Sequence, residues 1–307
     1  METWTQLFAF DWRIFMTATM QWFQGGNPYG HLTAEFGLPG AFAYPPTALT
    51  WFLLFLPFGG LGYYIWTAFQ IGGWWLLIRR DLRSQLVLFC WAPMVFHLLI
   101  GQTTLGIVLV LWAATKATRR GFWWGTAIAW TLTKPQVALL PVLWLLWHDR
   151  RIADRCVFWS GILTGTILLA IPPTLKNPAI WVDWLHSLTD YRARTLQMAP
   201  WQGFGIFVLL ATFILWYFKN RERLSDGGWQ WWFSAALIPQ NALYSSLVLL
   251  PLLRPKRNYW TLGGLAISSL LIGPATKITL PIILSGHILA AWFICGGPHR
   301  EDSDKIT

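Results

Sequence analysis

Apolar stretches, separated by short polar or basic breaks, run through most of the chain. The fullest of them cover 61–78, 85–100 and 157–172. A membrane-spanning helix needs roughly 20 mostly apolar residues, so we expect these three stretches to span a membrane. The runs are continuous rather than alternating, which indicates helices. The pattern predicts an all-α polytopic membrane protein, with further apolar helices over 105–114, 204–218, 259–272 and 280–295.

Two pairs of shorter apolar arms each surround a polar tripeptide that contains proline. The arms 122–133 and 137–147 surround Lys134-Pro135-Gln136, and the arms 229–238 and 243–253 surround Pro239-Gln240-Asn241. Non-helical backbone at membrane depth is tolerated only where protein or a water-filled cavity satisfies its polar groups. Broken helices of this kind commonly line binding sites. We therefore expect short or broken transmembrane helices that contribute to a site.

Two other segments do not have the membrane pattern. Residues 11–45 form an expected outer loop with an amphipathic helix, and residues 177–202 form a second outer segment. In the second segment, one helical face carries Trp181, Trp184, Leu185 and Leu188, which is typical of a helix lying at the membrane interface. The sequence predicts a single integral membrane domain over 1–297, followed by a disordered cytoplasmic tail over 298–307.

Composition and charge agree with this pattern. The chain of 307 residues is 55% hydrophobic and 12% charged, and it has 24 Trp, a residue that favours the membrane interface. The net charge of +10 comes from basic clusters between apolar runs, the positive-inside pattern, and does not indicate nucleic-acid binding. With those clusters inside, both polar segments and all the polar breaks lie outside. The stretch 44–78 then forms one span plus a re-entrant arm, or two crossings if Arg79 and Arg80 lie outside.

The first candidate functional residue is Lys134, which lies in an apolar stretch. A Lys at the centre of a spanning helix costs roughly 2.5–3.5 kcal/mol, and it usually finds a partner or a polar cavity; the alternative is snorkelling to the interface. The outer amides are either hydrogen-bonding contacts between helices or donors that line a site. They are Gln102, Gln136, Gln240 and Asn241. A general base acting on the outer face must be one of Glu2, Asp11, Glu35, Asp183 and Asp190.

No motif for a metal or a cofactor is apparent. The six His residues are dispersed, and no phosphate loop, dinucleotide fingerprint or nucleophile elbow occurs. The three cysteines, Cys90, Cys156 and Cys295, have apolar neighbours and are expected to be packing thiols. Residues 1–10 lack a basic region and a long apolar core, so no cleavable signal peptide is expected.

Several motifs, taken in order, resemble one family. Asp11 with Phe15 and Ala18, then the Gly-Gly-Asn-Pro-Tyr run at 25–29 and Tyr44-Pro45-Pro46, resemble the first outer loop of glycosyltransferase family 87. Gly101-Gln102, with Thr104 where Asn is usual, and the stretch from Gly125 to Gln136 are similar to two further family elements. The resemblance is strongest over 11–146. It implies the membrane C-type glycosyltransferase fold.

The resemblance also implies a reaction. A hexose, with mannose as the first expectation, would move from a polyprenyl-phosphate sugar to a lipid or glycan acceptor. Transfer would proceed with inversion and without a metal, on the outer face of the plasma (inner) membrane. Asp11 would be the general base, and Lys134 and Arg13, with Arg192 and Arg194 as further candidates, would meet the phosphate. The remaining candidate substrate-binding residues are Asn27, Tyr29, Tyr44, Gln102, Gln136, Gln240, Asn241 and Tyr244.

Two other interpretations stay open. Broken helices and a Lys in an apolar stretch equally suit a transporter or flippase for a lipid-linked or anionic solute. A degenerate, non-catalytic family member is the other. The family normally has a spanning helix before the loop aspartate and often a His after the late proline break. Here ten residues precede Asp11, and residues 242–244 are Ala, Leu and Tyr.

Overall fold

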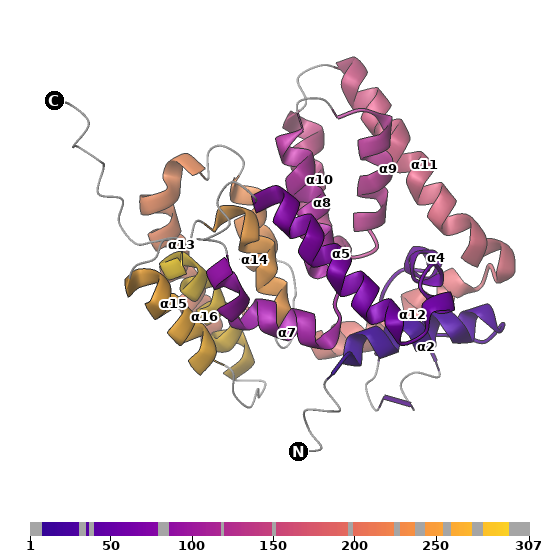
Figure 1. The fold of residues 1–307 in the computed structure, drawn as a ribbon, viewed down its shortest axis with the longest axis horizontal. Helices are drawn as coiled ribbons and strands as arrows, with labels where there is room; N and C mark the ends of the chain where they lie inside the picture. The colour runs from indigo at the N-terminus through magenta and orange to yellow at the C-terminus, as the bar shows by residue number, and fades with distance from the viewer. Residues whose placement is uncertain are drawn as a thin grey trace.

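In the computed structural model, all the regular secondary structure of the described residues is helical, as the hydrophobic pattern predicted (Figure 1). The structure describes residues 8–30, 35–36, 40–78, 86–117, 120–148, 152–195, 199–223, 228–236, 243–253, 259–271 and 279–294. The helices of the first half are α2 (Phe10–Phe23), α4 (Thr47–Leu53), η1 (Leu56–Phe58), α5 (Leu61–Ile78), η2 (Leu86–Cys90), α7 (Ala92–Ile100), α8 (Thr104–Lys116), α9 (Phe122–Thr131) and α10 (Pro135–His148). Those of the second half are α11 (Ile152–Lys176), α12 (Ile180–Thr195), α13 (Gly205–Arg223), α14 (Trp229–Ala236), η5 (Leu243–Leu252), α15 (Tyr259–Leu270) and α16 (Thr279–Ile294).

One expected span is broken in the structure. Residues 85–100 were expected to be a continuous helix, but the described part consists of the 3-10 helix η2 and the nine-residue helix α7. Pro93 lies in the first turn of α7. Proline has no N–H to donate and its ring blocks the preceding turn, so a helix begins near a proline more readily than it runs through one.

Length and composition identify one helix able to cross a membrane alone. Among the described residues, Asp154–Lys176 meets that requirement. Two bent pairs, Thr47–Phe58 with Leu61–Leu77 and Ala92–Ile100 with Thr104–Lys116, each turn by 116°. Counting each pair as one broken span gives up to three candidate crossings in the part of the chain that is described.

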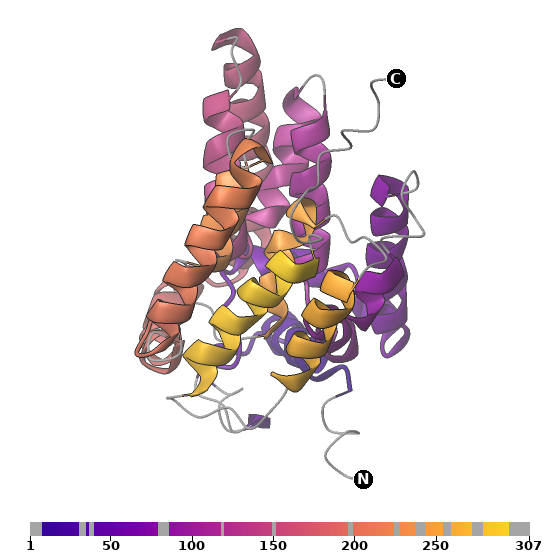
Figure 2. The ribbon, with the colours of Figure 1, turned by 90° about the vertical axis from the view of Figure 1, so that its left-hand side faces the viewer.

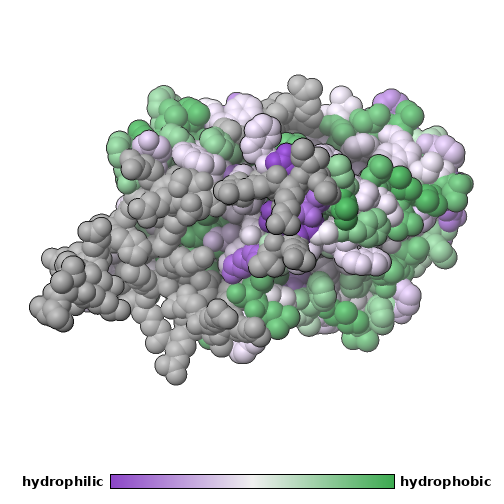
Figure 3. Space-filling view, turned by 90° about the horizontal axis from the view of Figure 1, so that it is seen from above, coloured by the Kyte–Doolittle hydropathy of each residue, from purple (hydrophilic) through white to green (hydrophobic). Residues whose placement is uncertain are grey.

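Different helices lie at the two ends of the molecule. α2 and α12 lie at one end, whereas the end of α8, the start of α9, the end of α10 and the start of α11 lie at the other (Figure 1). Helix α16 packs between α13 and α15 in the C-terminal part (Figure 2). Seen from this second end, the coloured surface carries mostly hydrophobic residues around its edge and hydrophilic residues toward its middle (Figure 3). This distribution suits a helical body with lipid around its sides.

Helices α9 and α11 approach closely enough that only glycine fits between them. A Cβ atom on Gly125 would lie 2.2 Å from the carbonyl oxygen of Phe158, and one on Gly161 would lie 2.1 Å from that of Phe122. Small residues let helix backbones meet in this way inside membranes. The contact fixes α9, and with it the position of the break that follows at 132–134.

Aromatic packing holds α2 against α4 and the residues that directly follow α4. The Phe15 ring stacks on Phe52 at 4.5 Å, and Trp12 meets Phe55 edge-on at 5.3 Å. Ala9, directly before α2, has the left-handed φ of 52°, and its N–H donates to the carbonyl of Leu99 at 2.8 Å. A left-handed alanine is uncommon, and this hydrogen bond ties it to the end of α7. The first turn of α2, which contains Asp11, therefore lies next to the break after α7.

Candidate active site

The break between α7 and α8 lies at the centre of the candidate site. Gly101 ends α7 with φ 76°, in the left-handed region that glycine adopts without strain. A Cβ atom on Gly101 would lie 2.7 Å from the Cβ of Trp12, so α2 also requires glycine here. The following residue, Gln102, is 3% exposed and belongs to neither helix. Its side chain points into the space between the helices.

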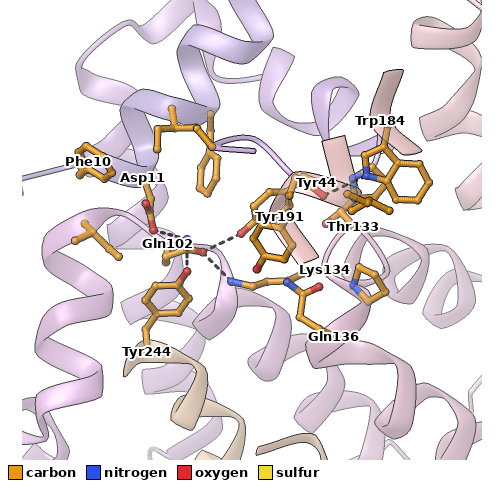
Figure 4. A pocket seen from close by; sticks show the side chains of 18 of the residues that line it. Phe10, Asp11, Tyr44, Gln102, Thr133, Lys134, Gln136, Trp184, Tyr191 and Tyr244 are labelled. Atoms are coloured by element: carbon orange, nitrogen blue, oxygen red, sulfur yellow. Dashed lines mark hydrogen bonds between the residues drawn. The ribbon is translucent and has the colours of Figure 1, made fainter. Parts of the chain in front are cut away.

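The Gln102 amide joins four side chains from four parts of the chain (Figure 4). Its Nε2 donates to the carboxylate of Asp11 and, at 3.0 Å, to the hydroxyl of Tyr244. Its Oε1 accepts from Lys134 Nζ at 2.9 Å and from the hydroxyl of Tyr44 at 3.0 Å. A carboxylate only accepts and an ammonium only donates, so these partners fix which way the amide faces. One amide thus stands between an acid and a cation.

Lys134 is buried rather than snorkelling to an interface. It is 3% exposed, and its Nζ also donates to the hydroxyl of Thr104 at 2.7 Å. The ring of Tyr244 lies 4.6 Å from Nζ and that of Tyr44 lies 5.7 Å away, both within cation–π range. An ammonium has three N–H groups, and two have oxygen acceptors among the described residues. The third N–H group can donate to a ligand.

These side chains line a cavity of about 570 Å³. Ligand sites usually measure 300–1,000 Å³ and combine apolar walls with a few polar groups. Helix α12 forms one wall with Trp184, Leu188 and Tyr191, which follow at the spacing of one helical face. The other lining residues are Phe10, Asp11, Ile14, Phe15, Ala41, Ala43, Tyr44, Pro45, Phe96, Ile100, Gln102, Thr133, Lys134, Pro135, Gln136 and Tyr244.

Tyr44 is held as a neutral hydroxyl. Burial raises the pKa of Tyr44 well above its usual value, so the group stays protonated and donates to Gln102. Behind it, the hydroxyl of Tyr29 donates to the carbonyl of Tyr44 at 2.9 Å, and burial raises the pKa of Tyr29 as well. Asn27 Oδ1 accepts from the N–H of Tyr29 at 2.9 Å. Asn27 and Tyr29 therefore support the loop that carries Tyr44.

The structure brings six of the predicted site residues into the cavity lining: Asp11, Tyr44, Gln102, Lys134, Gln136 and Tyr244. Asn27, Tyr29 and Arg13 do not line it, and the Arg13 guanidinium lies 5.8 Å from the centre of the Phe10 ring. Arg192 and Arg194 belong to α12, but their side chains lie outside the described part of the structure. Gln240 and Asn241 lie outside the described residues altogether.

Some lining or supporting residues were missed or left undecided by the sequence. Thr104 stands where the family usually has Asn, and it accepts a hydrogen bond from Lys134. Tyr191 was not selected, although its spacing from Trp184 and Leu188 indicated a shared helical face. Trp184 lines the cavity with its Nε1 bonded to the carbonyl of Ala43 at 3.2 Å, whereas Trp181 bonds to Thr174. Within the described ranges, no group of three or more His, Cys, Asp and Glu residues could hold a metal ion.

Comparison with known proteins gives one match. The model of glycosyltransferase family 87 matches residues 42–281 of the 307. The matched range includes Gln102, Lys134 and Tyr244, and it extends well beyond 146, where the resemblance was expected to weaken. Asp11 precedes it. Neither a curated protein nor a solved structure matches the chain.

Proposed function

We propose that this chain, which belongs to glycosyltransferase family 87 and is therefore a membrane glycosyltransferase, moves a hexose from a polyprenyl-phosphate sugar to a hydroxyl of a lipid or glycan. The observation that carries the proposal is the Gln102 amide, which bonds to both Asp11 and Lys134 in one cavity. A base and a cation held together suit a reaction that deprotonates one oxygen while another leaves with negative charge.

In the proposed step, Asp11 accepts the proton of the acceptor hydroxyl. The acceptor oxygen attacks the anomeric carbon of the donor hexose and forms the new glycosidic bond. The bond from that carbon to the phosphate oxygen breaks on the opposite face, so the configuration inverts. The bonding electrons leave with the polyprenyl phosphate, which is already ionised and needs a cation rather than an acid.

Lys134 is the proposed partner of the leaving phosphate. It is the one cationic side chain among the described residues of the cavity lining. A buried ammonium interacts with a developing negative charge far more strongly than one in water does, because the local dielectric constant is low. A single cation suits a monophosphate ester better than a diphosphate. In this proposal the charge of the phosphate is met without a metal.

The α12 wall supports binding of the hexose. Trp184 and Tyr191 present aromatic surface to the cavity, and the hydrogen bond from Trp184 to Ala43 orients the indole. Gln136 and Tyr244 supply further polar groups for sugar hydroxyls. The cavity volume of about 570 Å³ suits a sugar and its phosphate, while the polyprenyl tail would stay in the bilayer. The site lies at the end of the molecule that contains α2 and α12. The opposite end is where the chain carries its basic residues between α8 and α9 and between α10 and α11, which supports an outer-face reaction.

The function is tested by hexose transfer in reconstituted liposomes. Wild-type protein should move label from radiolabelled polyprenyl-phosphate mannose, glucose or arabinose into a lipid acceptor pool. Asp11→Asn should lower the rate by roughly 10²–10⁴-fold, the usual contribution of a general base. Asp190→Asn removes an exposed carboxylate of α12 that does not line the cavity, and it should keep wild-type activity.

The role of the cation is tested in the same assay. Lys134→Ala should lower the rate by roughly 10²–10³-fold, because the leaving phosphate loses its charge partner. Lys116→Ala, an exposed lysine at the end of α8, is the matched control and should leave the rate unchanged. Full activity in both Asp11→Asn and Lys134→Ala would refute the site assignment. Donor movement across the bilayer without incorporation would instead indicate a transporter.

A further inference from the structure

The backbone at the α7–α8 break needs hydrogen-bond partners from outside these two helices. The carbonyl of Gln102 follows the end of one helix and precedes the start of the next, at a turn of 116°. It accepts from Trp66 Nε1 at 3.1 Å and from Gln70 Nε2 at 3.2 Å. Both donors belong to α5. Buried backbone groups left without such partners would cost several kcal/mol in a membrane.

Gln70 also serves the other side of the break. Its Oε1 accepts the N–H of Gly106, in the first turn of α8, at 2.9 Å. The first N–H groups of a helix have no partner within the helix, so Gln70 acts as a cap supplied by a neighbouring helix. His97 Nε2 lies 3.0 Å from the same oxygen. Because Oε1 only accepts, His97 donates to it.

These contacts make Gln70 a bridge beneath the site. It is 1% exposed and His97 is fully buried, and neither lines the cavity. The Gln70 amide satisfies a carbonyl before α8 and an N–H inside α8, so it holds the break in one conformation. The side-chain amide of Gln102 then accepts one backbone N–H, that of Thr103 at 3.1 Å, and its remaining hydrogen bonds go to side chains of the site. Among those side chains are Asp11 and Lys134.

We propose that Gln70 is a positioning residue for the transfer reaction, acting through Gln102. The proposal rests on the function proposed above, and it extends the site to a helix that contributes no side chain to the cavity lining. Trp66 and His97 assist, the first by sharing the Gln102 carbonyl and the second by holding the Gln70 amide. A merely structural role would instead make Gln70 important for folding and independent of Gln102.

A double-mutant cycle separates these two roles. Gln70→Leu should lower kcat by roughly 10- to 100-fold, the cost of a displacement of about 1 Å at a catalytic group. In a Gln102→Ala background, the same substitution should have at most about a twofold further effect, because coupled residues are not additive. Gln70→Glu keeps the acceptor oxygen for Gly106 and His97 but sets a carboxylate oxygen against the Gln102 carbonyl, so it should lose activity as Gln70→Leu does. Losses that multiply in the double variant would overturn the proposal.

A labelling measurement tests the positioning without relying on transfer activity. In a variant without native cysteines, Gln102→Cys should react slowly with N-ethylmaleimide, because position 102 is buried. Adding Gln70→Leu should speed the reaction at least about tenfold by releasing the break. Gln230→Leu, at a buried glutamine of α14 outside the cavity lining, should leave the rate unchanged. An unchanged rate with Gln70→Leu overturns the proposal, whereas inactive wild-type protein overturns only the proposed function.

Discussion

At the scale of single residues, the amide of Gln102 organises the site. A carboxylate in its place would lack a donor for Asp11, and an ammonium would lack an acceptor for Lys134. A primary amide serves both groups with one side chain. Because the amide is buried, each lost hydrogen bond leaves an unsatisfied polar group away from water and costs free energy.

The amide requirement predicts the effect of Gln102→Glu, which changes the side-chain volume little. The new carboxylate would repel that of Asp11 and would compete with the phosphate for Lys134, so transfer should fall about 100-fold. The measurement is the liposome transfer rate. Gln24→Glu makes the same change at an exposed position after α2 and should leave the rate unaltered. Retained activity in Gln102→Glu would show that the N–H donor is not required.

At the scale of secondary-structure elements, the polar side chains of the site lie at helix breaks and ends. Asp11 is in the first turn of α2, Gln102 lies between α7 and α8, and Lys134 lies between α9 and α10. Tyr244 is at the start of η5. Chain breaks in a membrane require a polar interior, and the same interior receives polar side chains. The prediction that short arms would surround the site followed from this constraint.

A substitution at Gly101 tests the break itself. Gly101→Ala places a methyl group 2.7 Å from the Cβ of Trp12 and 2.9 Å from Cδ2 of Tyr63, and it retains an unfavourable φ. Stability should fall by ~1–3 kcal/mol or more, and α2 should shift with Asp11. Transfer rate and thermal unfolding in detergent measure the two effects. Gly72→Ala, within α5, would place its methyl group in open space and should preserve both; equal effects of the two substitutions would contradict the argument.

At the scale of the whole molecule, α11 runs from one end of the protein to the other (Figure 1). It is the single described helix that could cross a membrane alone. Its last residue, Lys176, donates to the carbonyl of Phe23, at the end of α2, and lies 5.5 Å from the centre of the Trp22 ring. Its other end adjoins the basic α10–α11 connection. If α11 spans the membrane, the α2 and α12 end lies outside.

This orientation can be measured by cysteine labelling in intact cells. Cys156 is exposed near the start of α11, not packed in the interior as the sequence predicted, and it should react with a membrane-impermeant maleimide only after permeabilisation. In a variant whose native cysteines are replaced, Asp190→Cys on α12 should react in intact cells, because the positive-inside rule leaves that end outside. Labelling of both positions from the same side would refute the proposed topology and the outer-face site.

The sequence by itself determined the class of the protein, the approximate bounds of most described helices and the helix breaks near Gln102 and Lys134. These properties depend on local apolar length, proline and charge. Local pattern was insufficient over 85–100, where the described residues form η2 and α7 instead of one span. It was also insufficient for the amides, whose role in a site or in helix contacts depends on partners elsewhere.

Only the tertiary structure decided which polar residues meet. Asp11 and Gln102 are 91 residues apart, and Gln102 and Tyr244 are 142 apart, yet one amide contacts both. Their convergence depends on the aromatic contacts of α2, the glycine approach of α9 to α11, and the support of the break by Gln70. Such contacts are determined by the packing of whole helices, which a linear pattern of apolar and polar positions does not specify.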